Sequence, residues 1–161
     1  MAIYMKFGAI KGAVTTKGYT DWIELLSTQM GAGRGIGSAR GTGSNREAAE
    51  PSISEIVVTK HWDAASSSLL FQEALSGLLN NEVQIDFSTT NKSKQDTYLT
   101  LKLWNCGIAS YSMSGHGDKP TESLSLNFSK VEITPIKIAA NLSPVPGEKV
   151  AFDLEKMQAN A

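Results

Sequence analysis

Two histidines, His61 and His116, are the side chains best suited to acid–base or metal chemistry near neutral pH. No second ligand stands at metal-binding spacing from either histidine, which disfavours a metal site. A Ser–His–acid triad is assembled in space rather than in sequence, so the spacing leaves that arrangement open. However, the chain lacks the G-x-S-x-G motif that places a nucleophilic serine on a tight turn. We therefore expect no enzyme activity and no cofactor.

Other reactive side chains have ordinary structural explanations. Cys106 is the only cysteine, so an internal disulfide is impossible, and its place among strand-forming residues indicates a small buried hydrophobe. The serines 66–68 fit the first turn of a helix, where serine is tolerated. Salt bridges to Lys60 or Arg46 would explain three carboxylates that could otherwise pair with one another: those of Glu50, Glu55 and Asp63.

The segment Gly31–Glu50 (GAGRGIGSARGTGSNREAAE) holds six glycines and one large apolar side chain, Ile36. We expect a long loop that forms neither a core nor a regular element on its own, and such loops usually carry a function or are disordered. No register matches G-x-G-x-x-G, and Gly-Lys-Ser/Thr is absent. The segment is followed by Pro51 and a predicted strand, so no helix N-terminus is there to bind a phosphate. A nucleotide site is therefore disfavoured.

The composition excludes several classes of protein. The chain has 161 residues and a formal charge of -1, from 15 basic and 16 acidic residues. This length predicts one domain, 1–161, with a core of its own. The balanced charge predicts neither nucleic acid as a partner nor an anionic membrane. No apolar run is long enough for a signal peptide or a membrane span, so we expect folding in the cytoplasm and no membrane insertion.

The stretch 50–88 predicts a strand, a helix and a strand. Residues 53–59 are rich in β-branched side chains, and Asp63 stands where a helix N-cap is expected. The helix is predicted over about 64–77, and Gly77 is predicted to end it in a left-handed conformation. Helical spacing predicts one apolar face, formed by Ser67, Leu70, Phe71, Ala74, Leu75 and Leu78.

The remaining chain alternates with the period of strands. Residues 83–87 and 97–113 alternate between apolar and polar, with a bulge or bend expected at Cys106–Gly107 and a polar connection over 88–96. Residues 122–133 alternate most regularly, with a slip near Ser129. One amphipathic helix must cover a sheet. We therefore predict a mainly β protein: an antiparallel barrel of about seven to eight strands with one flanking helix.

Several motifs occur in an order and spacing typical of one family. They are Ile10-Lys11-Gly12 with Asp21–Leu25; Thr59-Lys60 with Asp63, Ala65-Ser66 and Leu69-Leu70; Tyr98–Lys102 with Ser110–Ser112; Thr121–Phe128; and Phe152-Asp153-Leu154. The chain thereby resembles the haemolysin-coregulated proteins (Hcp), the inner-tube subunits of bacterial type VI secretion systems. It departs from the family pattern at Lys11-Gly12-Ala13, Ser68 and Thr134-Pro135-Ile136.

The resemblance implies a barrel that assembles into hexameric rings, which stack into a tube driven out of the cell by a contractile sheath. The implied partners are further copies of the chain, spike and sheath proteins, and effector proteins carried in the lumen. It implies secretion from the cytoplasm through the type VI apparatus without a cleaved signal peptide. It also implies no activity in the core domain, and no C-terminal toxin extension is expected after the last strand.

Within this interpretation the Gly31–Glu50 loop projects from one ring toward the next. We expect four of its side chains to take part in ring stacking: Arg34, Ile36, Arg40 and Arg46. Two other functions stay open. One is a monomeric barrel that binds a small molecule or a glycan, with the loop as a lid. The other is a hydrolase that uses a serine or a pair of carboxylates.

Overall fold

The computed structural model describes residues 1–37, 48–91, 94–138 and 144–159. These residues form one helix and thirteen strands: β1 (Ala2–Phe7), β2 (Ile23–Leu25), β3 (Ser27–Gln29), β4 (Ala32–Gly33), β5 (Ser52–Ile53), β6 (Ile56–His61), α1 (Ser67–Ser76), β7 (Asn81–Asn91), β8 (Lys94–Ser114), β9 (Thr121–Asn127), β10 (Lys130–Ile138), β11 (Pro144–Pro146), β12 (Val150–Asp153) and β13 (Gln158–Ala159). Seven of the strands have four or more residues, in line with the predicted number.

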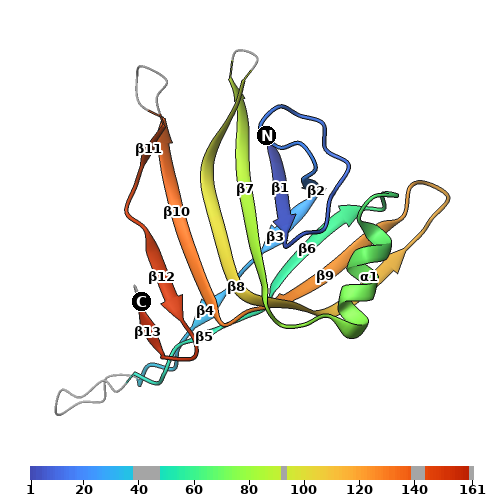
Figure 1. Cartoon of the computed structure of the whole chain (residues 1–161). Helices are drawn as coiled ribbons and strands as arrows, with labels where there is room; N and C mark the ends of the chain where they lie inside the picture. The colour runs from blue at the N-terminus through green and yellow to red at the C-terminus, as the bar shows by residue number, and fades with distance from the viewer. Residues whose placement is uncertain (38–47, 92–93, 139–143, 160–161) are drawn as a thin grey trace, which may run out of the picture.

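The 21-residue strand β8 belongs to two sheets that run in different directions (Figure 1). Its first part pairs with β7 and β10, and its last part pairs with β9. Asn105 lies at the bend with φ 50°, and the pairing with β7 shifts register there. At Gly107 an added Cβ would lie 2.3 Å from a methyl carbon of Leu79, so the exposed Leu79 side chain would have to move. The predicted bend at Cys106–Gly107 is therefore confirmed.

A second connection between the sheets comes from β2 and β3. β2 pairs with β1, whereas β3 pairs with β6 after a single intervening residue, Leu26. The pairings thus lead from β8 through β7 and β1 to β2, and from β3 through β6 and β9 back to β8. This antiparallel arrangement encloses one apolar core and confirms the predicted fold class. Fully buried side chains in this core include Phe7, Ile23, Ile56, Val58, Leu70, Ile85, Leu103, Leu124 and Leu126.

The alternating stretch 122–133 forms two strands rather than one. β9 pairs with β6 and the end of β8, whereas β10 pairs with the beginning of β8 and with β12. Between them the backbone N–H of Ser129 donates to the carbonyl of Trp104 (3.0 Å), where β8 bends. The apolar positions still face the core, since Phe128 and Val131 are buried on either side of the break.

The expected polar connection over 88–96 is mostly strand. Ser88 pairs with Thr97, and the pairing continues to Asn91 and Lys94. The Ser88 hydroxyl hydrogen-bonds the side-chain oxygen of Gln95 (2.9 Å). Backbone pairing in a hairpin needs no apolar side chains, which is why a polar composition suggested a loop where the strands in fact continue.

The helix is shorter than the predicted 64–77. The Asp63 carboxylate accepts hydrogen bonds from the backbone N–H groups of Ala65 (2.9 Å) and Ser66 (2.6 Å), as a capping residue does. These residues form a turn, and the regular helix begins at Ser67. Gly77 ends it with φ -66°, so the predicted left-handed conformation is wrong. Glycine is required for a different reason: an added Cβ would lie 2.5 Å from the carbonyl oxygen of Glu73.

Only part of the predicted apolar face of α1 is buried. Ser67 and Leu70 are buried and Ala74 is half-buried, but Leu75 and Leu78 are 72% and 74% exposed. The reason is that the helix packs mainly against the last part of β8, beyond one end of the core (Figure 1). This helix has only ten residues and is too short to cross a membrane.

Candidate functional site

The glycine-rich segment forms an arm with a paired base. β4 and β5 pair antiparallel, and Ile36 forms a further bridge with Ala48. The hydroxyl of Ser54 also donates to the carbonyl of Gly31 (2.9 Å). The expectation that this segment forms no regular element is therefore wrong at its base. Backbone hydrogen bonds and a serine hydroxyl are sufficient there, although the segment has almost no apolar side chains to bury.

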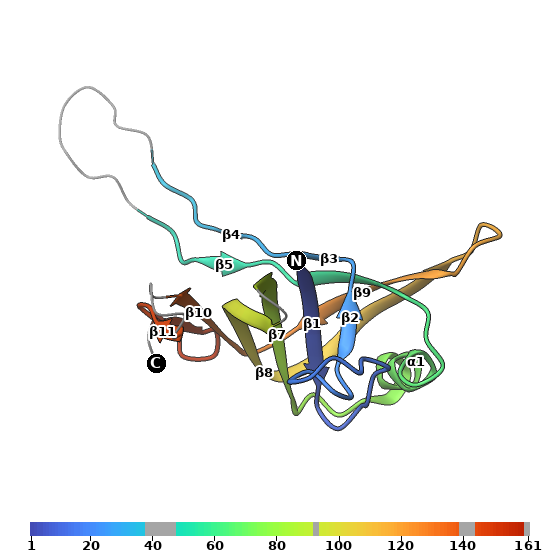
Figure 2. The same ribbon diagram turned by 90° about the horizontal axis from the view of Figure 1, so that it is seen from above.

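The described part of the arm leads away from the body of the molecule (Figure 2). Of the four side chains predicted to act in stacking, Arg34 is exposed and Ile36 is 51% exposed. Arg40 and Arg46 lie outside the described residues. An arm that carries a cation and an apolar side chain into solvent is suited to contact another surface, and this role stays a prediction.

A buried ion pair connects the two strands next to the helix. Lys60 on β6 and Glu122 on β9 are direct partners in the pairing register, and both side chains are fully buried. The Lys60 Nζ lies 2.6 Å from the Glu122 Oε2. The ammonium also donates to the His61 carbonyl (2.8 Å) and to the Ser67 hydroxyl (3.0 Å). A buried charge is costly unless it is paired and hydrogen-bonded in this way.

The helix and β8 complete this network. The Ser67 hydroxyl donates to the Glu122 Oε2 (2.7 Å), and the Tyr111 hydroxyl donates to the Glu122 Oε1. Burial and the neighbouring Glu122 raise the pKa of Tyr111. Burial alone would raise the pKa of Asp63, but hydrogen bonds from Ser66 and the charge of Lys60, 3.2 Å away, lower it. The network therefore holds the start of α1 against both strands.

The sequence contained a signal for this network that the motif search missed. The predicted Lys60–Asp63 salt bridge is confirmed, but Glu122 was not linked to it. Lys60 is in phase with Ile56 and Val58, and Glu122 is in phase with Leu124, so alternation places both charges on the core side. A charged residue in phase with a buried face indicates a buried pair.

His116 and Cys106, two of the side chains considered for catalysis, lie in surroundings that do not favour it. The His116 ring and the Ser114 hydroxyl share a hydrogen bond (2.9 Å); both side chains are exposed, Ser114 at the end of β8 and His116 on the turn that follows. Burial raises the pKa of Cys106 to about 12, which makes its thiol unreactive. Among the described residues, no three His, Cys, Asp or Glu side chains gather closely enough to hold a metal ion.

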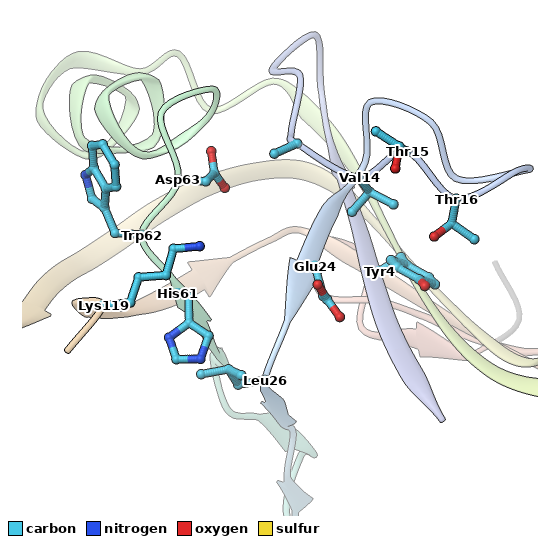
Figure 3. Close-up of a pocket in the computed structure, with 11 residues that line it drawn as sticks. Tyr4, Val14, Thr15, Thr16, Glu24, Leu26, His61, Trp62, Asp63 and Lys119 are labelled. Carbon is cyan, nitrogen blue, oxygen red and sulfur yellow. The ribbon is translucent and has the colours of Figure 1, made fainter.

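An open groove of about 430 Å³ contains His61 (Figure 3). His61 and Lys119 lie on one wall, and Glu24 and Tyr4 face them from β2 and β1. The groove is lined by both signs of charge and by short polar side chains. It lacks the enclosed, mostly apolar lining typical of a small-molecule site.

Some of the exposed apolar side chains lie at two opposite ends of the molecule. At one end, Phe71, Leu75 and Leu79 follow the last part of β8; we call these the helix patch. Phe71 contacts Tyr111 edge-on at 5.3 Å between ring centroids, and Leu79 lies against Gly107. At the other end lie three exposed side chains of the outer strands and the turn before β13, which we call the C-terminal edge: Val145, Val150 and Met157. Both views place α1 and these strands far apart (Figures 1 and 2).

Comparisons with known proteins point to one family. A sequence profile described as "Type VI secretion system effector, Hcp" matches residues 4–134. A solved structure described as "Structure of a type six secretion system protein" is 21% identical, with a TM-score of 0.87 and coverage of 99% of both chains. Hcp1 from Salmonella typhimurium is 18% identical, with a TM-score of 0.72 and coverage of 98% of this chain and 97% of that chain. Hcp3 from Pseudomonas aeruginosa is 20% identical, with a TM-score of 0.58 and coverage of 94% and 97%. No curated protein matches.

Proposed function

Because the chain belongs to the Hcp family of type VI secretion system proteins, we propose that it forms hexameric rings that stack into an exported tube. The function as a type VI secretion Hcp subunit follows from the family match over residues 4–134. The ring, its stacking and the carriage of effectors in its lumen are the proposal. The alternative of a monomeric ligand-binding barrel has no support from the family or from the open, charge-lined groove.

The observation that carries the ring is the exposure of large apolar side chains at two ends of a small protein. Leu75 and Leu79 are each 72% exposed, and Val150 is 52% exposed. Monomeric soluble proteins rarely leave such side chains together in water. A ring brings one surface of each copy against a different surface of the next and closes when the rotation allows. Both ends of the subunit would then be covered.

We further propose that the arm contacts the neighbouring ring in a stack. Support comes from the exposed Arg34 and Ile36 and from the direction of the arm away from the body (Figure 2). Arg34, Arg40 and Arg46 would pair with carboxylates on the facing ring. If changing all three arginines to serine leaves tube formation and secretion intact, this role is wrong.

Export through the type VI apparatus without a cleaved signal peptide, and contact with spike, sheath and effector proteins, are parts of the same proposal. They rest on membership of the family. We also propose that the domain itself catalyses no reaction. The Ser114–His116 pair supports this, because both side chains are exposed to solvent at the end of β8.

The test is the mass of the purified protein in solution, measured by light scattering behind a sizing column. A mass of six chains supports the ring, which electron microscopy would then show along its axis. A monomer over the whole accessible concentration range would refute the proposed assembly.

A further inference from the structure

We propose that the open groove containing His61 binds a short extended peptide of a partner protein, which pairs with the backbone of Glu24 on β2 (Figure 3). The peptide carries a basic and an acidic side chain two residues apart. This binding activity goes beyond the proposed tube and does not depend on the ring, because one chain supplies every residue of the groove.

The groove lies where two strands separate. The backbone N–H of Leu26 donates to the carbonyl of Thr59 on β6 (2.7 Å), so the chain after β2 is joined to β6 at this point. Before it, β2 pairs only with β1 among the described strands, and β6 runs on to His61 with only β9 beside it. Figure 3 shows Glu24 and His61 on the two sides of this opening. The groove therefore has a strand edge on each side.

The backbone of Glu24 is the open position on the β2 edge. Successive residues of a strand direct their N–H and carbonyl groups alternately to its two sides. Leu26 donates toward β6, so Glu24, two residues earlier, also points away from β1. The carbonyl of Trp22 is occupied by the N–H of Val14 (3.1 Å), and in the described part of the chain no segment pairs with Glu24 on this side. One residue of an extended peptide can exchange two backbone hydrogen bonds there.

The opposite edge offers a donor. The N–H of Trp62 donates to the carbonyl of Pro120 on the β9 side (2.9 Å), so His61 faces the groove by the same alternation. The His61 carbonyl already accepts from the Lys60 Nζ (2.8 Å). Its N–H is left to bind a carbonyl of the peptide. Backbone groups from both edges thus converge on one extended segment.

The charges of the two walls differ in sign. His61 and Lys119 lie on one wall and Glu24 on the other, and all three side chains are exposed. Within the described residues, no ion pair engages Glu24 or Lys119. Asp63, which also lines the groove, is already paired with Lys60 (3.2 Å). Residues two apart in an extended peptide share a face, so a basic and an acidic residue at that spacing complement Glu24 and Lys119.

The rim of the groove is in place before a peptide binds. Residues 13–16 form this rim, and the carbonyl of Val14 accepts from the N–H of Asp21 (2.9 Å). The N–H of Gly12 donates to the carbonyl of Asp21 (2.8 Å). A Cβ added at Gly12 would lie 2.1 Å from the carbonyl oxygen of Trp22, so this close approach requires glycine. A rim that is already ordered loses little entropy on binding.

Nuclear magnetic resonance with a defined peptide tests the site. The probe is acetyl-Thr-Lys-Val-Asp-Thr-amide, titrated into the intact protein labelled with ¹⁵N and deuterium so that the signals remain visible in a ring. We expect the amide signals of Glu24 and His61 to shift with peptide concentration, and those of β10 to stay unchanged. The shifts at each concentration give the dissociation constant.

Methylated peptides test the strand pairing. With the charged side chains on the same face as Glu24, the N–H groups of the peptide's lysine and aspartate point toward β2. Methylating both nitrogens should weaken binding by about tenfold or more, because the hydrogen bonds to Glu24 are lost. Methylating the nitrogen of the central valine is the matched control. Its N–H faces the N–H of His61, so it makes no hydrogen bond, and binding should be largely kept.

Protein variants test the charges. Glu24→Gln and Lys119→Gln should each weaken binding about two- to fivefold, as expected for exposed ion pairs. Lys137→Gln, at an exposed lysine of β10, is the matched control and should leave the dissociation constant unchanged.

Three results would overturn the proposal: no shift at Glu24 and His61, equal losses from the two methylated peptides, or shifts confined to α1. Equal binding of acetyl-Thr-Gln-Val-Asn-Thr-amide would refute the assigned charges. A monomeric protein would refute the ring and leave the peptide test valid.

Discussion

Replacing Lys60 with methionine isolates the contribution of the buried ion pair. The change removes the ammonium that lies 2.6 Å from the Glu122 Oε2 and keeps a side chain of similar length. Glu122 then stays in a fully buried site with hydroxyl donors but no opposite charge. Removing one partner of a buried pair costs about 3–5 kcal/mol of unfolding free energy. We expect Lys60→Met to lose about that much.

A second substitution distinguishes the cost of an unpaired buried charge from the cost of lost packing, because the two predict opposite changes in unfolding free energy. Glu122→Gln added to Lys60→Met removes the negative charge. Its carbonyl oxygen can accept from one of the two hydroxyls, Ser67 or Tyr111, and its NH₂ group can donate to the other. Because the unpaired buried charge is gone, the double variant should be more stable than Lys60→Met by about 1–3 kcal/mol, in the range of coupling energies between contacting residues. Each change alone should destabilise the protein.

The assay is urea unfolding followed by tryptophan fluorescence. It is carried out below the concentration at which rings form, because association adds to the apparent stability. The matched control is Lys149→Met, which removes the exposed lysine of the pair with Glu132 and should cost less than about 1 kcal/mol. If Lys60→Met is no more costly than this control, or if adding Glu122→Gln destabilises it further, the account of the buried pair is wrong.

Three further predictions follow from the same contacts. Asp63→Asn should reduce stability most at neutral pH: the lowered pKa of Asp63 means that its stabilising contribution is present above the ordinary carboxyl pKa and is lost as pH falls through the folded-state pKa. Urea unfolding at pH 7 and pH 3 should show a smaller difference between variant and parent at pH 3, and an equal difference would contradict the assignment. Gly77→Ala should lower the unfolding free energy by about 1–3 kcal/mol, because the new Cβ would lie 2.5 Å from the Glu73 carbonyl oxygen. Gly33→Ala is the control in the same unfolding experiments, since no atom lies within 4 Å of a Cβ added there. Raising sodium chloride from 0.1 M to about 1 M should weaken ring stacking through arginine and leave the apolar subunit contact intact, so sedimentation would show tubes dissociating into rings, whereas dissociation to single chains would argue against an apolar contact.

The arm shows the limit of composition as a guide to structure. Six glycines over twenty residues indicated a loop without regular structure, yet β4 and β5 pair at its base. Pairing between strands depends on backbone groups brought together from both ends of the segment. Composition describes side chains and carries little information about that encounter.

The sequence predicted only part of the burial pattern of α1, which carries exposed apolar side chains of the helix patch. Helical spacing correctly placed Leu70 inside, but it assigned Leu75 and Leu78 to the same buried face. Spacing states which side chains share a face of the helix. It does not state how much of that face the rest of the protein covers, and here the core ends before the helix does.

The sequence by itself determined the local features of this protein: strand-forming alternation, the capping carboxylate of Asp63, the bend near Gly107 and the family motifs. These depend on residues close together in the chain, so their spacing is sufficient to reveal them. Only the tertiary structure decided that Lys60 meets Glu122 from 62 residues away, and that an apolar row beside β8 stays in solvent. Both depend on which strands become neighbours and in what register. That choice is made by the packing of the whole chain, because no single segment can bury its own apolar surface.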